Sequence, residues 1–224
     1  MIIAIDGPAA SGKSTTARLV AKGLDFTYLD TGAMYRAVTF AVIEQAVNLN
    51  DKTQLHTLLT GIELELSTRA EQTEIVLNGN DVSEKIRSVK VTGMVSAVSA
   101  EPAVRKAMVA LQRRIGAKQN CVIEGRDIGT VVFPDAEFKF YIVADYATRA
   151  ARRQKDLEKQ SEHRSLKDLI EDLKIRDIKD STRTHSPLRQ AADAIIIDTS
   201  NLTIKEQVTL IVDQVKRRHN KVKK

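Results

Sequence analysis

Residues 2–15 read Ile-Ile-Ala-Ile-Asp-Gly-Pro-Ala-Ala-Ser-Gly-Lys-Ser-Thr, and this stretch decides the fold. From Gly7 to Ser14 it matches G-x-x-x-x-G-K-[ST], the pattern of a phosphate-binding loop. An apolar run of strand length precedes the match, and residues 15–24 follow it with helical periodicity. The sequence therefore predicts a strand, a phosphate loop and a helix in that order.

The residue types in this loop suit the binding of phosphate. Glycines let the backbone pass close to phosphate oxygens, and successive N–H groups with a helix N-terminus supply partial positive charge. Lys13 adds a full charge toward the β- and γ-phosphates, and the Ser14 hydroxyl is a candidate ligand for Mg²⁺. The loop alone leaves open whether the γ-phosphate is hydrolysed, used for switching or transferred. The residues expected to bind the nucleotide are Gly7, Pro8, Ala9, Ala10, Ser11, Gly12, Lys13, Ser14 and Thr15.

The rest of the chain alternates short apolar runs with longer helical patterns. Short buried strands that alternate with helices are typical of an α/β fold, in which helices cover both faces of a parallel sheet. Five strands are predicted, at residues 2–5, around 28–29, and at 121–123, 138–143 and 194–197. Helices are predicted at residues 15–24, 33–46, 103–115, 147–159, 166–178 and 203–218.

Residues 62–82 follow a different pattern. Ile-Glu-Leu-Glu-Leu and Thr-Glu-Ile-Val-Leu alternate with a period of two, and the turn signal Asn78-Gly79-Asn80 comes next. This alternation predicts a small antiparallel insert with one solvated face. With 224 residues and no Pro/Gly-rich linker, the chain is expected to form one compact unit.

Composition restricts the classes of partner. The formal net charge of +6 suits anionic partners, such as nucleic acid, anionic lipid or phosphorylated metabolites. Aromatic residues make up only 4% of the chain and Trp is absent, so the stacking surfaces of single-strand nucleic-acid binders are scarce. No stretch approaches the roughly 20 apolar residues that span a bilayer, and no signal peptide is evident, so we expect a cytosolic protein.

Cysteine and histidine give no sign of a catalytic or metal centre. Cys121 is the single cysteine and lies in an apolar run, so a buried structural thiol is expected rather than a nucleophile. The four histidines lack metal-ligand spacing and are expected at the surface.

Arginines stand where a second phosphate would need them. Arg36 follows the second predicted strand, and Arg126 with Asp127 follows the third, at the strand ends where open α/β sheets bind ligands. A kinase that holds two polyanions needs such bidentate donors. Asp30 is a candidate to hold a magnesium-bound water or to orient the acceptor, with a helix N-cap as the alternative.

Two further basic sets have helical spacing. Arg149, Arg152 and Arg153 fall at i, i+3 and i+4, and Arg176, Asp180 and Arg183 fall at i, i+4 and i+7. Each set is expected on one helix face, and together they suggest a lid that closes. The alternative for each arginine is a solvated position beside an acidic partner.

Several ordered motifs together resemble the bacterial cytidylate kinases, a branch of the P-loop nucleoside monophosphate kinases. The resemblance covers nearly the whole chain, and ordered motifs are more specific than a lone phosphate loop. The residues that carry it are 5–13, 29–36, 125–135 and 176–188. It implies one P-loop kinase domain, with a core at about residues 1–58 and 91–224, a monophosphate-binding insert at about 59–90 and a helical lid at about 147–185.

The resemblance also implies residue roles. Ser96, Arg105 and Asp127 match the cytosine contacts of the family, and Thr31, where the family often has Ser, Arg36 and Arg126 match its acceptor-phosphate contacts. Arg176, Asp180 and Arg183 match its ribose and lid contacts. An arginine and a carboxylate can pair with the cytosine carbonyl and amino groups, so uridine monophosphate is expected to be a poorer substrate.

The expected activity is phosphorylation of CMP and dCMP, with ATP as donor and Mg²⁺ as cofactor. Catalysis is expected to rest on positioning and charge, through Lys13, Arg126, Arg152, Arg153 and Asp30, without a covalent intermediate. We expect a monomer that acts on free nucleotides and binds neither nucleic acid nor membrane. A kinase for another small acceptor, such as adenylate or shikimate, and a nucleotide-dependent RNA-binding module are the alternatives.

Overall fold

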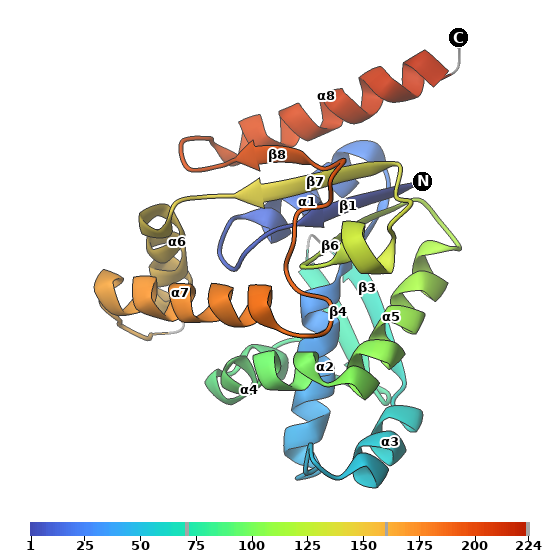
Figure 1. The fold of residues 1–224 in the computed structure, drawn as a ribbon, viewed down its shortest axis with the longest axis vertical. Helices are drawn as coiled ribbons and strands as arrows, with labels where there is room; N and C mark the ends of the chain where they lie inside the picture. The colour runs from blue at the N-terminus through green and yellow to red at the C-terminus, as the bar shows by residue number, and fades with distance from the viewer. Residues whose placement is uncertain (70–71, 160, 223–224) are drawn as a thin grey trace. The chain divides into compact units, whose positions relative to one another are not determined.

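The computed structural model describes residues 1–69, 72–159 and 161–222, which form two compact units (Figure 1). The phosphate-loop unit contains Met1–Tyr28 and Gln119–Lys224, and the middle unit contains Leu29–Lys118. The insert expected at 59–90 falls within the middle unit, and the lid expected at 147–185 falls within the phosphate-loop unit. That functional division stays a prediction.

The phosphate-loop unit is built on a five-stranded sheet in the order β2-β6-β1-β7-β8. The parallel α/β class and the number of strands expected from the sequence are thereby confirmed. Its strands are β1 (Ile2–Asp6), β6 (Cys121–Gly125), β7 (Phe138–Val143) and β8 (Ile195–Asp198), with β2 (Thr27–Asp30) beginning in this unit and ending in the other. Its helices are α1 (Lys13–Leu24), α6 (Tyr146–Glu158), α7 (Leu166–Thr182) and α8 (Ile204–Val222), with a short π-helical turn η2 (Ile128–Val132).

Strand register brings the functional loops to one edge of this sheet. The strand β1 is parallel to both β6 and β7, and Asp6 lies opposite Gly125 on one side and Tyr141 on the other. Parallel strands end on the same edge, so the loops that follow Asp6 and Gly125 leave the sheet side by side.

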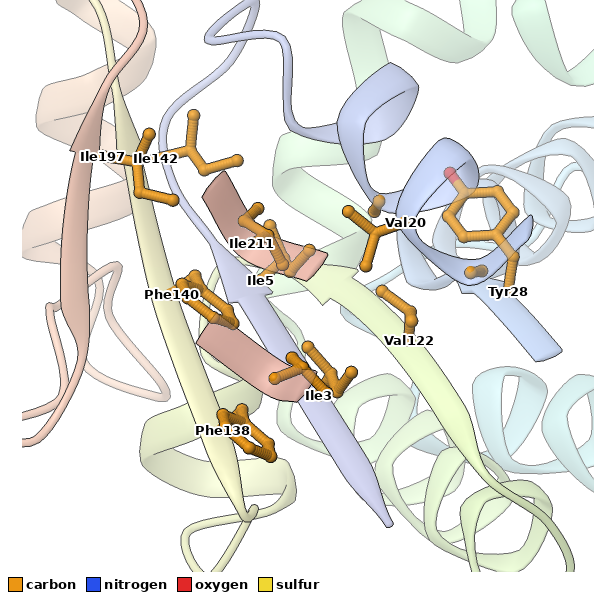
Figure 2. Packing of buried hydrophobic residues seen from close by; sticks show 13 residues of the cluster. Ile3, Ile5, Val20, Tyr28, Val122, Phe138, Phe140, Ile142, Ile197 and Ile211 are labelled. Carbon is orange, nitrogen blue, oxygen red and sulfur yellow. The ribbon is translucent and has the colours of Figure 1, made fainter. Parts of the chain in front are cut away.

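The core of the phosphate-loop unit lies between the sheet and two helices (Figure 2). Alternate apolar residues of the strands pack against α1 and α8, which is why the helical periodicity of these segments was readable in the sequence. The largest contributors include Ile5, Phe140 and Ile142 from the strands, Val20 from α1 and Ile211 from α8.

The middle unit combines helices with the small antiparallel sheet that alternation predicted. The sheet has the order β3-β4-β5, and the turn between β4 and β5 has Asn78 at φ 49° and Gly79 at φ 77°. These positive φ angles are those that Asn-Gly turns favour. The elements are α2 (Thr31–Glu44), α3 (Lys52–Thr60), β3 (Leu64–Arg69), β4 (Gln72–Leu77), β5 (Asn80–Asp81), the short η1 (Lys85–Arg87), α4 (Val89–Ala100) and α5 (Pro102–Gly116).

Two helices of the middle unit, α3 and α4, lie where the sequence pattern predicted none. Each has a clear N-cap, since the side chain of Asp51 accepts from Thr53 and Gln54 N–H and that of Ser88 accepts from Val91 N–H. The α4 sequence is rich in β-branched residues and contains a glycine, which lowers its helix propensity. Packing against α2 and α5 stabilises it instead.

Burial agrees with the expectations for cysteine and histidine. Cys121 is fully buried and free, and the side chains of His56, His163 and His185 are exposed. The side chain of His219 lies outside the part of the chain whose side chains are described. Among the described residues, none of the helices is both long and apolar enough to cross a membrane.

Candidate active site

The phosphate loop wraps closely around the end of β1. A Cβ atom on Gly7 would stand 2.2 Å from the Ile142 carbonyl oxygen, so only glycine fits where the loop leaves the strand. The Lys13 ammonium donates to the Pro8 carbonyl at 3.1 Å, and the Ser11 hydroxyl donates to the same oxygen at 3.0 Å. The lysine is 7% exposed, and its charge therefore points back into the loop.

A buried carboxylate that the sequence analysis did not single out lies beside the loop. Glu124, near the end of β6, accepts from the Ser14 hydroxyl at 2.8 Å and from the Tyr28 hydroxyl at 2.5 Å. It is 3% exposed. Its position one residue before a strand end, next to the strand that carries the phosphate loop, was the available signal.

Arg149 joins the loop to α7. Its Nε donates to the Ala9 carbonyl at 2.8 Å, and its two terminal nitrogens donate to both oxygens of Asp177 at 2.6 and 2.8 Å. Such a bidentate pair is strong and directional. Arg149 is 3% exposed, so this member of the first basic set is a clamp inside the unit.

The next arginine of the set, Arg152, also binds backbone. It donates to the Ser11 carbonyl at 3.0 Å and to the Thr199 carbonyl at 2.7 Å. Burial lowers the pKa of its guanidinium, although arginine stays charged at neutral pH. Arg153 is half-buried, and its side chain makes no hydrogen bond to any residue within the described ranges.

A second group of charges gathers around one carboxylate, and we call Arg126, Arg176, Asp180 and Arg183 the Asp180 cluster. Arg126 Nε donates to Asp180 Oδ2 at 2.9 Å, across a sequence separation of 54 residues. Burial disfavours the Asp180 carboxylate, but Arg126, Arg176 and Arg183 together hold its pKa below the usual value. With Asp127, which lies 3.9 Å from Arg183, three cations face two anions, and the group keeps a net positive charge.

Arg183 stands at the end of α7. The helix ends at Thr182, and Arg183 is its C-cap, with a helical φ of −61° and an extended ψ of 142°. Its side chain therefore still leaves the helix on the face of Arg176 and Asp180, as the spacing predicted. Arg183 Nε donates to the Ser186 carbonyl at 2.6 Å, and its terminal nitrogen lies 3.9 Å from Asp127 Oδ1. The side chain of Arg183 therefore lies near both Asp180 and Asp127.

The middle unit holds the remaining predicted residues. Arg105 on α5 is 5% exposed; its Nη1 donates to the Ser99 carbonyl at 3.4 Å, and its guanidinium lies 5.5 Å from the centre of the Tyr35 ring. Ser96 is half-buried on α4, and the side chain of Asp30 caps α2 by accepting from Ala33 N–H at 2.8 Å. The N-cap alternative for Asp30 is thus observed, while Thr31 and Arg36 lie on the first turns of the helix that it caps.

Comparison with known protein families identifies the family of this chain. The model for cytidylate kinase matches residues 3–217. The chain belongs to the cytidylate kinase family. A cytidylate kinase from Halalkalibacterium halodurans is 47% identical over 97% of this chain and 98% of its own length. One from Lactobacillus gasseri is 44% identical over 97% of this chain and 95% of its own.

A solved structure supports the fold alone. An uncharacterized protein from Eubacterium ventriosum superposes with a TM-score of 0.54 at 13% sequence identity, covering 96% of this chain and 98% of that one. The family match confirms the resemblance that the motifs indicated, and with it the kinase class of the enzyme.

The structure brings together part of what the sequence predicted. Arg126, Arg176, Asp180 and Arg183 meet in one cluster, and Lys13 and Ser14 lie in the phosphate loop. The contacts of Glu124 and the clamp between Arg149 and Asp177 were missed, because each joins segments far apart in the chain.

Proposed function

We propose that this chain transfers the γ-phosphoryl group of Mg-ATP to CMP and dCMP. Phosphorylation of CMP is the activity of the family to which the chain belongs. The donor, the metal, the deoxy substrate and the residue roles are the proposal. So are the expectations of a monomer, of a cytosolic location and of free nucleotides as the only partners.

One observation supports the proposal most strongly. The phosphate loop and the segment that begins with Arg126 follow two adjacent strands whose last residues lie opposite each other. Gly7 follows Asp6 and Arg126 follows Gly125, and these strand ends lie opposite each other in the β1–β6 pairing. The first loop suits a triphosphate, and the second carries an arginine of the Asp180 cluster. Two polyanions held at neighbouring strand ends are what phosphoryl transfer between nucleotides requires.

The donor side is the phosphate loop. Its backbone N–H groups and Lys13 would hold the phosphates of ATP, with Lys13 leaving the Pro8 carbonyl for the β- and γ-phosphates. The Ser14 hydroxyl and the Glu124 carboxylate form an all-oxygen donor pair, which fits Mg²⁺. When bound there, the metal would neutralise phosphate charge.

The acceptor side uses arginines. In the phosphate-loop unit, Arg126, Arg176 and Arg183 would bind the phosphate and ribose of CMP, with Asp180 holding them in place. Asp127 would accept from the cytosine amino group. In the middle unit, the residues proposed to bind CMP are Thr31, Arg36, Ser96 and Arg105, and Asp30 is proposed to orient the acceptor.

No general base is needed for the transfer. The acceptor phosphate is largely ionised near neutral pH, so its oxygen is already a nucleophile. Lys13 and Arg126 would stabilise charge as the γ-phosphoryl group moves, and Arg152 and Arg153 would exclude water from it. For Arg152 this role requires release from Ser11 and Thr199, which it contacts in this structure.

A coupled assay of ADP release from Mg-ATP tests the proposal. It is run separately with CMP, dCMP, UMP, AMP and GMP, and without acceptor, and each arm is repeated with EDTA. Turnover with CMP and dCMP alone, lost on chelation, is the expected result. Turnover without acceptor, or a preference for another base, would keep the phosphate loop but overturn the proposed substrate.

A further inference from the structure

Asp6 is a buried carboxylate to which no catalytic or binding role has yet been given. It is the last residue of β1 and is 4% exposed. Its Oδ1 accepts from Ile128 N–H and its Oδ2 accepts from Gly129 N–H, both at 2.8 Å. One carboxylate therefore holds two successive backbone donors at the start of η2.

These bonds fix the segment that carries Arg126 and Asp127 at both of its ends. On one side, Gly125 is held opposite Asp6 by the pairing of β6 with β1. On the other side, Ile128 and Gly129 are held by the Asp6 carboxylate. The segment of Arg126 and Asp127 is therefore held at both ends by Asp6, the residue that directly precedes the phosphate loop.

The ionised carboxylate suits this task better than a neutral side chain. Each oxygen faces one donor, so an amide would present its own N–H₂ to one of the two N–H groups. Burying a charge has a large cost unless donors compensate it, and a strongly perturbed carboxyl group in a cleft is a candidate for function.

The charged groups that act on Asp6 are residues of the candidate active site. Burial, the largest cause, and Asp127 raise the pKa of the Asp6 carboxyl, while the two backbone donors and Arg126 lower it, and the net pKa is about 6. Tyr141, its neighbour on β7, has its own pKa raised by burial and by Asp6.

We propose that Asp6 is a positioning residue that sets Arg126 and Asp127 for the acceptor relative to the phosphate loop. This inference rests on the proposed function, because Arg126 and Asp127 are there the contacts of CMP. In this role Asp6 acts through these two residues and not by contact with a nucleotide.

The kinetic test is Asp6→Asn. We expect the KM for CMP to rise about tenfold to a hundredfold, the range for a lost charge-assisted hydrogen bond, with a lower kcat. The KM for ATP should change by less than about threefold, since the loop's own hydrogen bonds remain. An equal rise in both KM values, or no change in either, would overturn the positioning role.

Asp51→Asn is the matched control. Asp51 also accepts from two backbone N–H groups, but through Oδ1 alone, an oxygen that Asn retains. Its kinetics should equal those of the wild type.

A second measurement needs no variant and no catalysis. In ¹⁵N-resolved NMR of the wild-type protein between pH 4 and 8, the amides of Ile128 and Gly129 should titrate together with a midpoint near 6. Amides of Ile128 and Gly129 that titrate with different midpoints in an active enzyme do not share one carboxylate, and this result would overturn the role of Asp6 alone. An enzyme without CMP kinase activity would instead overturn the proposed function, which the substrate assay reveals first.

Discussion

The phosphate loop and the Asp180 cluster are the two sites proposed to bind phosphate, and they are built by different means. The loop is one continuous run of residues, and its positive potential comes mainly from backbone N–H groups and Lys13. The Asp180 cluster draws its arginines from the segment after β6, from α7 and from the C-cap of α7, and a single carboxylate holds them together. The difference teaches that a backbone site is visible in a motif, whereas a side-chain site depends on segments that meet only in the folded chain.

The largest expected effect on activity comes from removing the charge of the phosphate loop. Lys13→Ala should lower kcat by about a hundredfold to a thousandfold, because it removes the charge that follows the γ-phosphoryl group. The coupled assay measures this loss, and Lys22→Ala, an exposed lysine on the same helix, is the control. A kcat within about tenfold of the wild type would contradict the role of Lys13.

The next largest effect comes from removing the central carboxylate of the Asp180 cluster. Asp180→Asn leaves three arginines without their central anion, so the KM for CMP should rise about tenfold or more. The free energy of unfolding should fall by about 1–3 kcal/mol in denaturant titrations. Asp172→Asn removes an exposed carboxylate of the same helix that pairs with Arg164, so it should leave the KM for CMP unchanged and lower the unfolding free energy by less than about 1 kcal/mol. Unchanged CMP affinity in Asp180→Asn would separate the cluster from the acceptor.

The pH dependence of stability tests the interaction of Asp180 with its three arginines. The pKa of Asp180 is lowered in the folded state, so its stabilisation is complete above the unfolded pKa of about 3.9 and is lost as pH falls further. The difference in unfolding free energy between wild type and Asp180→Asn should therefore be constant from neutral pH to about 5 and shrink below about 4. A difference that grows on acidification would contradict the lowered pKa.

Two adjacent arginines of α6 allow a finer comparison. The side chain of Arg152 donates to the loop carbonyl of Ser11, whereas the side chain of Arg153 makes no hydrogen bond within the described residues. Arg152→Lys should lower both turnover and the unfolding temperature, the latter by about 2–4 °C per kcal/mol lost. Arg153→Lys should lower turnover alone, by about tenfold. Unchanged turnover in Arg153→Lys would remove it from the mechanism.

The smallest effect is expected at the opposite end of the functional strand. Cys121 begins β6 and Gly125 ends it, so a change at Cys121 tests whether function is confined to the carboxyl ends of the strands. Cys121→Ala should leave kcat within about twofold and lower the unfolding free energy by about 1–2 kcal/mol. Burial raises the pKa of the thiol, so native protein should also react slowly with thiol reagents. A large loss of kcat would contradict this separation.

Much of the fold could be predicted from local patterns. All five strands of the parallel sheet, the antiparallel insert and most helices follow from periodicity, turn signals and the loop motif. The helices α3 and α4 could not, because α3 is short and α4 contains β-branched residues that favour strands in isolation. Tertiary packing decided those elements.

The residues of the candidate site also fall into two groups, those that local sequence predicts and those that only tertiary contacts bring together. By itself, the sequence determined the phosphate loop, the family and the positions of Arg126 and Asp127 after a strand, because these depend on contiguous residues. Only the tertiary structure decided that Arg149 is a clamp, that Arg183 lies near Asp127 and that Glu124 meets Ser14. It also decided that Asp6 holds η2. These contacts join segments separated by up to about 140 residues, and no local period encodes which of many charged side chains will meet across such distances.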